Sequence, residues 1–368
     1  MKHVARRLLA ILVLIAIGPS RPHAQQPIND GDRVILITLD GARHQEVFGG
    51  LNADVFKSML RNGQKLEEQP AYKRFWAETP EARRQKLMPF FWGTWMAKHG
   101  SIAGNRALGS SVSLTNKHWF SYPGYAEILL GEAHDDTIKS NDPIRNPYPS
   151  VLEGLRTKLA LPRERVATFA SWGVFNAIVE HEPGATYVDA GLESPAVTDP
   201  ALKELHALQV EAAPPWGGTR YDIFTFKLAM AHFAAKRPRV TYIAFDETDD
   251  WSHDGKYDRL LDAYARTDRY LEQLWAWIQS QPDYRDRTHI LITTDHGRGK
   301  TGDEWKTHGA KVVGADETWI AFISPRMTQR GEWRDQPALT TSQVAATIAN
   351  WLGLDWRALH PAAGQAIK

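Results

Sequence analysis

The stretch RVILITLDG, residues 33–41, is a run of β-branched and other apolar residues that ends at an aspartate and a glycine. Two later stretches repeat the pattern, RVTYIAFD at 239–246 and HILITTD at 289–295. Similar short apolar runs occupy 165–171, 185–190 and 318–324. Near-continuous hydrophobic strands that alternate with helices are typical of a buried parallel sheet. The sequence therefore predicts an α/β fold with a mostly parallel central sheet and helices on both faces.

Three segments between and after these runs have helical patterns. Residues 151–159 form a short one, residues 257–278 present one broad apolar face, and residues 340–354 have a Thr/Ser start and a Gly stop. Segments 50–118 and 191–220 are rich in Pro, Trp and charged residues and have weak periodicity. We interpret these two segments as insertions over one face of the sheet.

The first residues have the layout of an export signal. Lys2, Arg6 and Arg7 precede a ten-residue apolar run, 8–17, and small residues follow near Ala24. The run is shorter than the roughly 20 residues that span a bilayer, so we expect no stable membrane anchor, although an uncleaved anchor is the alternative. The chain has no cysteine, which excludes a lipid-modified cysteine and any disulfide. The prediction is a signal peptide at 1–24 and a periplasmic or secreted protein.

The remainder, residues 25–368, contains no internal repeat or low-complexity linker, so we expect a single catalytic domain. The formal charge of the whole chain is +1, and four of its Lys and Arg residues lie in 1–24, which contains no acidic residue. Removal of the signal peptide would leave a formal charge of −3. A chain so close to neutrality is not expected to bind a nucleic-acid duplex. The oligomeric state is left open.

Carboxylates follow three of the predicted strands. Asp40 ends the first, Asp249 lies just after the strand at 239–246, and Asp295 ends the strand at 289–295. The carboxyl ends of parallel strands meet at one edge of a sheet, which is where ligands bind in open α/β folds. Carboxylates gathered there would repel one another without a positive partner. A metal site resolves this conflict.

Histidines accompany these carboxylates at ligand spacing. His253 is four residues after Asp249, which places both on one helix face, and His296 directly follows Asp295. His308 follows twelve residues later. Each residue alone is more often a turn former or a structural histidine, but the combination favours a metal site. Carboxylate and imidazole ligands without thiolate suit Zn²⁺, and also Mn²⁺ or similar ions.

Four motifs carry a resemblance to a known family: LITLDGAR, FSYPGYAEILLG, ETDDWSH and TTDHGRG…WKTHG. In this order they resemble the alkaline phosphatase superfamily, in particular its type I phosphodiesterase/nucleotide pyrophosphatase branch. The similarity covers roughly 33–355. It implies two zinc ions, and each ion has its own set of ligands. One set is Asp40, Asp295 and His296 with the oxygen of Ser121, and the other is Asp249, His253 and His308.

The resemblance also implies that Ser121 is the nucleophile, because the family places Thr or Ser before an aromatic residue and Pro at a helix start. From the residues alone, Ser121 is equally an N-cap. Nucleotide pyrophosphatases usually have Asn-His after the Pro, where Gly124 and Tyr125 stand here. The segment IKSND resembles the one that carries a phosphate-contacting Asn, which places that role on Asn141.

Several charged residues near these motifs have two interpretations. Asp246 and Asp250 either orient the metal ligands or are solvated turn residues. Arg298, Lys300 and Lys306 either contact substrate charge or lie in a solvated loop, and we favour the loop. Four histidines match no ligand spacing and are interpreted as structural: His44, His99, His118 and His134.

The function predicted from the sequence is hydrolysis of a small phosphoric ester, a diester or a monoester, through a zinc-activated serine and a phospho-enzyme intermediate. A sulfatase is an alternative, but the Cys/Ser-x-Pro-x-Arg motif of that group is absent because Tyr125 stands where the Arg would be. A metal-binding or ligand-binding member of the fold without turnover is the other alternative. The export signal disfavours a phosphomutase, and the lack of several membrane helices disfavours a phosphoethanolamine transferase.

Overall fold

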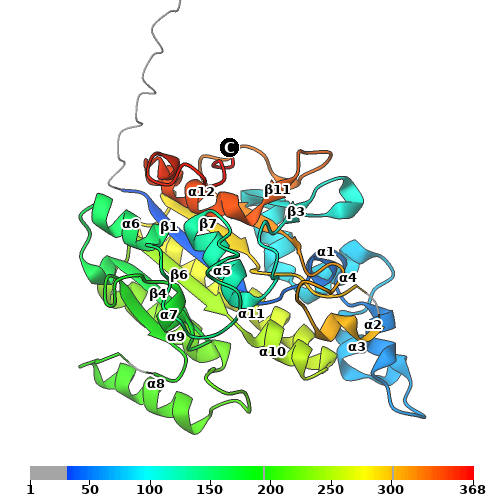
Figure 1. Cartoon of the computed structure of the whole chain (residues 1–368). Helices are drawn as coiled ribbons and strands as arrows, with labels where there is room; N and C mark the ends of the chain where they lie inside the picture. The colour runs from blue at the N-terminus through cyan, green and yellow to red at the C-terminus, as the bar shows by residue number, and fades with distance from the viewer. Residues whose placement is uncertain (1–30, 194, 301) are drawn as a thin grey trace, which may run out of the picture.

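The computed structural model describes residues 31–193, 195–300 and 302–368, so the predicted signal peptide lies outside the described residues. Its centre is an eight-stranded sheet with the order β10-β2-β9-β7-β1-β6-β4-β5 (Figure 1). The strands are β1 (Arg33–Leu39), β2 (Gly100–Ala103), β4 (Val166–Ala170), β5 (Tyr187–Ala190), β6 (Val240–Phe245), β7 (Thr288–Thr293), β9 (Ile320–Ile323) and β10 (Gly331–Glu332). A second, three-stranded sheet contains β3 (Val112–Ser113), β8 (Glu317–Thr318) and β11 (Leu339–Thr340).

Five neighbouring strands of the large sheet, β7-β1-β6-β4-β5, are all parallel, which confirms the predicted sheet. The six apolar runs recognised in the sequence all become strands of this sheet. The run at 318–324 forms β9, which pairs antiparallel with β7. The sheet is therefore mostly parallel, and β9 is the strand that runs against the others.

Helices cover both faces of the sheet, as predicted. The side chains of β1 point alternately into two hydrophobic cores, one on each face of the sheet. Ile35 and Ile37 belong to the first core, and Val34 and Leu36 belong to the second. The first core receives α1 (His44–Gly49), α2 (Ala53–Ser58), α3 (Pro70–Phe75), α4 (Pro80–Leu87), the π-helix η2 (Phe91–His99), α9 (Asp222–Lys236) and α11 (Tyr257–Ser280). The second core receives α5 (Ser121–Leu130), α6 (Val151–Lys158), α7 (Phe175–Ile178) and α12 (Val344–Trp351).

The remaining helices contribute fewer side chains to the two cores, among them Trp305 in the first and Trp356 in the second. They are α8 (Pro200–Glu211), α10 (Glu247–His253) and six 3₁₀ turns: η1 (Leu66–Glu68), η3 (Arg106–Leu108), η4 (Arg163–Arg165), η5 (Gly302–Lys306), η6 (Thr341–Gln343) and η7 (Trp356–Ala358). The predicted helix at 340–354 therefore begins as the η6 turn and continues as α12. Among the described residues, no helix combines the length and apolarity needed to span a bilayer.

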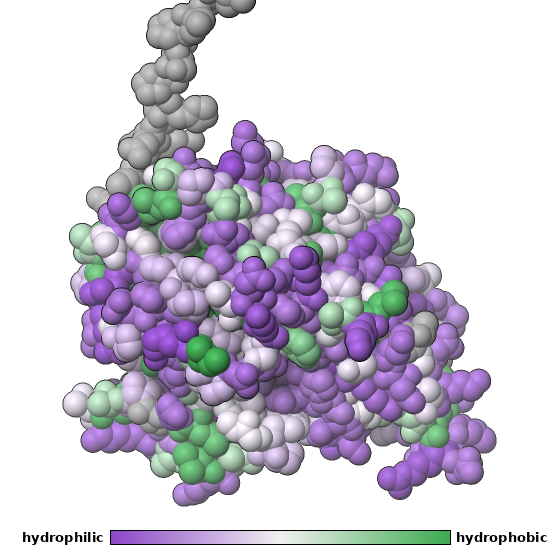
Figure 2. All heavy atoms as spheres, viewed as in Figure 1, coloured by the Kyte–Doolittle hydropathy of each residue, from purple (hydrophilic) through white to green (hydrophobic). Residues whose placement is uncertain are grey.

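Segment 50–118 is more than an insertion over one face. Its strand β2 pairs with β9 inside the large sheet, and Phe91 and Trp95 of η2 are fully buried in the first core. The sequence pattern hides this role because β2 has four residues and contains Gly100 and Ser101, which give little hydrophobic signal. Figure 2 shows a mainly hydrophilic surface on which hydrophobic residues form small, separate patches.

The strand register brings the carboxyl ends of three central strands together. Leu39 at the end of β1 is level with Phe245 of β6, and Thr38 is level with Thr293 of β7. The residues that follow these strands therefore leave the sheet side by side.

Candidate metal centre and nucleophile

The structure brings the six predicted metal ligands together in two groups at this edge of the sheet. One group is Asp40, Asp295 and His296, and the other is Asp249, His253 and His308. Within each group the candidate ligand atoms all lie within 4.8 Å of one another. The two groups adjoin, because the rings of His296 and His308 stack with centroids 3.9 Å apart. These are the two sets that the family resemblance implied.

The first group is fully buried and holds carboxylate oxygens that lack protein partners. Asp40, Asp295 and His296 are at most 1% exposed. Asp40 Oδ1 and Asp295 Oδ2 have no hydrogen-bond partner among the described residues, although His296 Nε2 lies 3.4 and 3.5 Å from them. A buried carboxylate oxygen without a donor is costly. The donor set and the orphaned oxygens fit a divalent cation.

Burial and the neighbouring Asp40 raise the pKa of Asp295 to about 8. Burial lowers the pKa of His296, but Asp295 and Asp40 outweigh burial and raise that pKa to about 9. The same two carboxylates that stabilise a protonated His296 would supply negatively charged ligands to a bound cation.

The second group is open to solvent on one side. His253 Nε2 lies 3.1 Å from His308 Nε2 and 3.2 Å from Asp249 Oδ2, so two imidazole nitrogens and a carboxylate oxygen converge. The side chain of His253 is 45% exposed, whereas that of Asp249 is 13% exposed. Burial and the neighbouring His296 lower the pKa of His308, which keeps this ring neutral and available as a ligand.

Backbone carbonyls fix the orientation of two of the imidazoles. His296 Nδ1 lies 2.8 Å from the carbonyl of Gly297, and His308 Nδ1 lies 3.0 Å from the carbonyl of Trp119. Because a carbonyl only accepts, Nδ1 donates in both rings, which leaves Nε2 facing the site as the atom that would bind an ion. Trp119 has a φ of 53°, a left-handed conformation uncommon for a large residue.

Ser121 is the first residue of α5 and lies beside the first group. Its Oγ is 3.4 Å from His296 Nε2, and the residue is 4% exposed. The N-cap residue is Phe120, so the interpretation of Ser121 as the helix cap is wrong. Its hydroxyl points into the site, where a helix N-terminus adds partial positive charge.

Gly124 and Tyr125 stand where nucleotide pyrophosphatases have Asn-His. Both residues contact the candidate metal ligands and so bring α5 close to them. A Cβ on Gly124 would lie 2.2 Å from the carbonyl oxygen of Asp295, so only glycine permits this contact. Tyr125 is buried, and its hydroxyl donates to Asp40 Oδ2 over 2.8 Å. The sequence reasoning missed this contact, although the spacing of Ser121 and Tyr125 already places both on one helix face.

Asn141 lies next to the first turn of α5. Its Oδ1 accepts from the backbone N–H of Tyr122 over 2.9 Å. This bond fixes the side chain next to Ser121 and turns the amide nitrogen away from Tyr122. The amide nitrogen makes no hydrogen bond to a described residue, and it remains available as a donor.

Arg298 is buried, which contradicts the favoured interpretation of a solvated loop. It is 1% exposed, its Nη2 donates to Asp249 Oδ1, and its Nε and Nη1 have no partner among the described residues. Burial lowers the pKa of Arg298 to about 9, although Asp40 opposes this. Lys300 and Lys306 form ion pairs with Glu317 and Asp303, each at 2.6 Å.

Asp246 is also buried rather than solvated. It is 6% exposed, and its backbone N–H donates to Asp222 Oδ1 over 2.9 Å at the start of α10. Burial raises the pKa of Asp246 well above its usual value, and the neighbouring Asp250 adds to this. Burial likewise raises the pKa of Asp250 to about 8. The pair lies in the first turn of α10, the helix that also carries Asp249, with Asp246 as its N-cap residue.

The four histidines interpreted as structural contact residues outside the two groups. His44 pairs with Glu317, His118 lies 3.0 Å from the carbonyl of Asp135, and His99 and His134 pack against Trp275 and Tyr148.

Comparisons with known proteins concern the family and the fold of the chain. The family model of type I phosphodiesterases/nucleotide pyrophosphatases matches residues 75–345. Among solved structures, Ps i-CgsB is 13% identical with a TM-score of 0.54, and the match covers 91% of this chain and 74% of that chain. The lipoteichoic acid synthase LtaP from Listeria monocytogenes is 10% identical with a TM-score of 0.52, covering 88% and 72%. No curated protein matches the sequence significantly. At such identities the structural likeness shows the fold alone.

Proposed function

The chain belongs to the type I phosphodiesterase/nucleotide pyrophosphatase family of the alkaline phosphatase superfamily, and from this premise we propose that it hydrolyses phosphoric esters with Ser121 as its nucleophile. The observation that carries the proposal is the position of Ser121 Oγ, 3.4 Å from His296 Nε2 at a buried helix N-terminus. A hydroxyl at this place faces the first group of candidate ligands, whose His296 stacks on His308 of the second group.

We assign one divalent ion to Asp40, Asp295, His296 and the Ser121 oxygen, and a second to Asp249, His253 and His308. The preferred ion is Zn²⁺, because the donors are imidazole nitrogens and carboxylate oxygens. When bound, two such ions supply positive charge that favours the serine alkoxide and neutralises phosphoryl oxygens. The orphaned oxygens of Asp40 and Asp295 support the first of these sites.

The chain's own groups define the chemical step. Ser121 Oγ forms a bond to phosphorus while the bond from phosphorus to the alcohol oxygen breaks, so the alcohol leaves and a phosphoserine remains. The serine proton passes to solvent, and the departing alcohol oxygen takes one from solvent. Water then attacks phosphorus, which releases the phosphate product and restores the hydroxyl.

Other groups position the phosphoryl group. Asn141 holds its amide nitrogen beside Ser121, because its Oδ1 is already bonded to the backbone N–H of Tyr122. That nitrogen can donate to a phosphoryl oxygen. The N-terminus of α5 adds a favourable field for negative charge. The fixed tautomers of His296 and His308 keep both Nε2 atoms directed at the site.

The location and substrate size belong to the same proposal. The signal-like residues 1–24 support export to the periplasm or beyond. A chain of formal charge +1 supports a small-molecule substrate rather than a nucleic-acid duplex.

The test uses zinc-loaded protein and three reporters: p-nitrophenyl phosphate, bis(p-nitrophenyl) phosphate and p-nitrophenyl sulfate. We expect turnover of at least one phosphate ester and little of the sulfate. Ser121→Ala should lower kcat by at least about 1,000-fold while circular dichroism and the melting temperature stay near wild type. Wild-type turnover in Ser121→Ala would overturn the nucleophile. Two bound ions without turnover of any ester would favour a binding protein instead.

A further inference from the structure

A large groove opens beside the exposed side of the metal centre. It has a volume of about 940 Å³ and lies between α2–α3 and the segment that joins α10 to α11. Figure 1 shows α2 and α3 next to α10 at this side of the molecule. The volume is in the range of sites for organic ligands and exceeds what a phosphoryl group needs.

The groove begins at the second group of candidate ligands. Lys306, two residues before His308, lines the groove. Gly255, two residues after His253, is also part of the lining, and a Cβ added to it would lie 3.2 Å from the side chain of Lys306. A substrate phosphoryl group at Ser121 would therefore extend its remaining part past His253 into this groove.

Positive charge dominates the lining. Five cationic side chains line the groove, against Asp258 and Asp262. Asp262 is already paired with Arg74 at 2.7 Å and lies 4.0 Å from Arg259. Arg61 and Lys256 are exposed and form no ion pair with a described residue. This excess is local, because the whole chain carries a formal charge of only +1.

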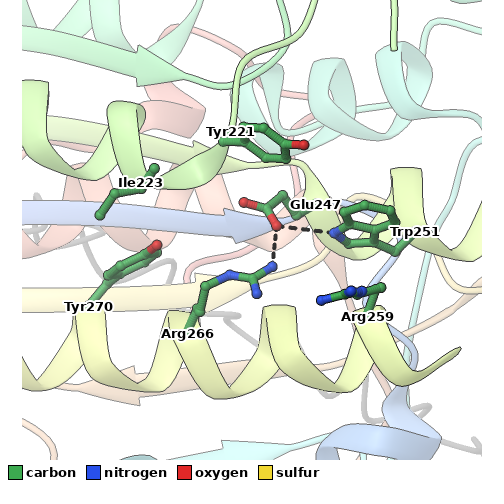
Figure 3. A pocket seen from close by; sticks show the side chains of 7 residues that line it. All are labelled: Tyr221, Ile223, Glu247, Trp251, Arg259, Arg266 and Tyr270. Atoms are coloured by element: carbon green, nitrogen blue, oxygen red, sulfur yellow. Dashed lines mark hydrogen bonds and ion pairs between the residues drawn. The ribbon is translucent and has the colours of Figure 1, made fainter. Parts of the chain in front are cut away.

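Trp251 supplies an aromatic surface to the groove. Trp251 and Arg259 separate it from a second cavity of about 420 Å³, whose lining Figure 3 shows. The indole nitrogen of Trp251 donates to Glu247 over 3.1 Å, and Trp216 packs edge-on against its ring with centroids 4.5 Å apart. These contacts hold Trp251 in a fixed orientation, and its ring offers a surface for an organic skeleton.

We propose that this groove binds the non-reacting part of the substrate, and that this part carries a second anionic group held by Arg61 and Lys256. The substrate class is then a phosphoric ester of an alcohol that bears a further phosphate or carboxylate, with its carbon skeleton against Trp251. The proposal rests on the proposed function, since it takes the reacting phosphoryl group to lie at Ser121. A substrate with a neutral alcohol part would leave Arg61 and Lys256 without an anionic partner.

The test compares pairs of ligands that differ in one anionic group. Calorimetric titration of the zinc-loaded protein uses glucose 1-phosphate, glucose 1,6-bisphosphate and glucuronic acid 1-phosphate as probes. We expect the bisphosphate to bind at least about tenfold more tightly than the monophosphate at low salt, and this ratio to fall as salt rises. The glucuronic acid ester tests whether the second anionic group is a carboxylate or a phosphate. A groove specific for a carboxylate would bind this ester more tightly than the bisphosphate.

The double variant Arg61→Ala/Lys256→Ala should reduce the ratio to less than about threefold. The matched control is Lys57→Ala/Lys73→Ala, which removes two exposed charges of α2 and α3 that do not line the groove, and it should keep the wild-type ratio. Equal binding of all three probes to wild type would overturn the proposal, as would an unchanged ratio in the double variant. Titration needs no turnover, so a failure of the proposed function shows up separately in the ester assays.

Discussion

The hydroxyl of Tyr125 donates to Oδ2 of Asp40 over 2.8 Å, and both residues are at most 1% exposed. Burial raises the pKa of Tyr125 well above its usual value, so the phenol keeps the proton that it donates. This bond joins α5, which carries Ser121, to the end of β1. Tyr125 therefore holds the proposed nucleophile and a candidate metal ligand in one arrangement.

Tyr125→Phe removes this bond and keeps the ring. Asp40 then loses the only side-chain hydrogen bond that it makes to the described residues, so we expect a loss of about 1–3 kcal/mol in the free energy of unfolding and a 10- to 100-fold weaker affinity for the first ion. Urea unfolding and competition with a chelator measure these two effects.

Tyr242→Phe is the matched control, because Tyr242 is equally buried but bonds Thr38 at 3.0 Å rather than a metal ligand. It should lose stability without losing metal affinity. Equal metal affinities for both variants and wild type would show that Tyr125 does not position Asp40.

Gly124→Ala places a methyl group 2.2 Å from the carbonyl oxygen of Asp295, where the backbone must move. We expect a loss of roughly 1–3 kcal/mol in stability and a drop in kcat of at least tenfold, because α5 shifts away from the metal ligands. Gly49→Ala is the control, since no atom lies within 4 Å of its added Cβ and α1 ends there. A fully active Gly124→Ala enzyme would contradict the close approach.

The two groups of candidate ligands differ in exposure, which predicts stepwise metal loss. The side chain of His253 is 45% exposed, whereas that of His296 is 0% exposed. Timed treatment with EDTA should remove one equivalent of metal at least about tenfold faster than the second, as measured by elemental analysis. His253→Ala should retain one tightly bound equivalent, and His118→Ala, outside both groups, should retain two. Simultaneous loss of both equivalents would argue against two separate sites.

The sequence was sufficient to predict the sheet and to place the candidate ligands, because both depend on local patterns. Asp295 and His296 are adjacent at a strand end, and Asp249 and His253 are one helical turn apart. Parallel strands must then bring them to one edge. The structure groups these residues as predicted, while their roles remain predictions for the experiments above.

Features that depend on contacts between distant segments could not be predicted in this way. Arg298 was interpreted as a loop residue because nothing in its neighbourhood shows that Asp249, 49 residues earlier, packs against it. Strand β2 was missed because it pairs with β9 more than 200 residues away, Ile102 with Ala321. The strand itself has only four residues, and most of them are small. Long-range packing, rather than propensity, decides both cases.

Glu317 links α1 to the segment around Lys300, which follows the candidate ligand His296. Its carboxylate lies 2.9 Å from His44 Nε2 and 2.6 Å from Lys300 Nζ. Burial alone would raise its pKa, but the hydrogen bonds from His44 and Lys300 outweigh burial and lower the pKa from 4.5 to about 2. A folded-state pKa below the unfolded value contributes stability that is present above pH 4.5 and is lost as the pH falls toward 2.

Glu317→Gln should therefore lower the free energy of unfolding by roughly 1–3 kcal/mol at pH 7, and by progressively less between pH 4.5 and 3. Urea unfolding of metal-free wild type and variant at pH 7, 5 and 3.5 measures the difference, in which acid effects of other residues cancel. Glu204→Gln, at an exposed position on α8, is the control and should differ little from wild type at any of these pH values. A Glu317→Gln deficit that stays constant down to pH 3.5 would mean that packing, rather than the charge of Glu317, stabilises this contact.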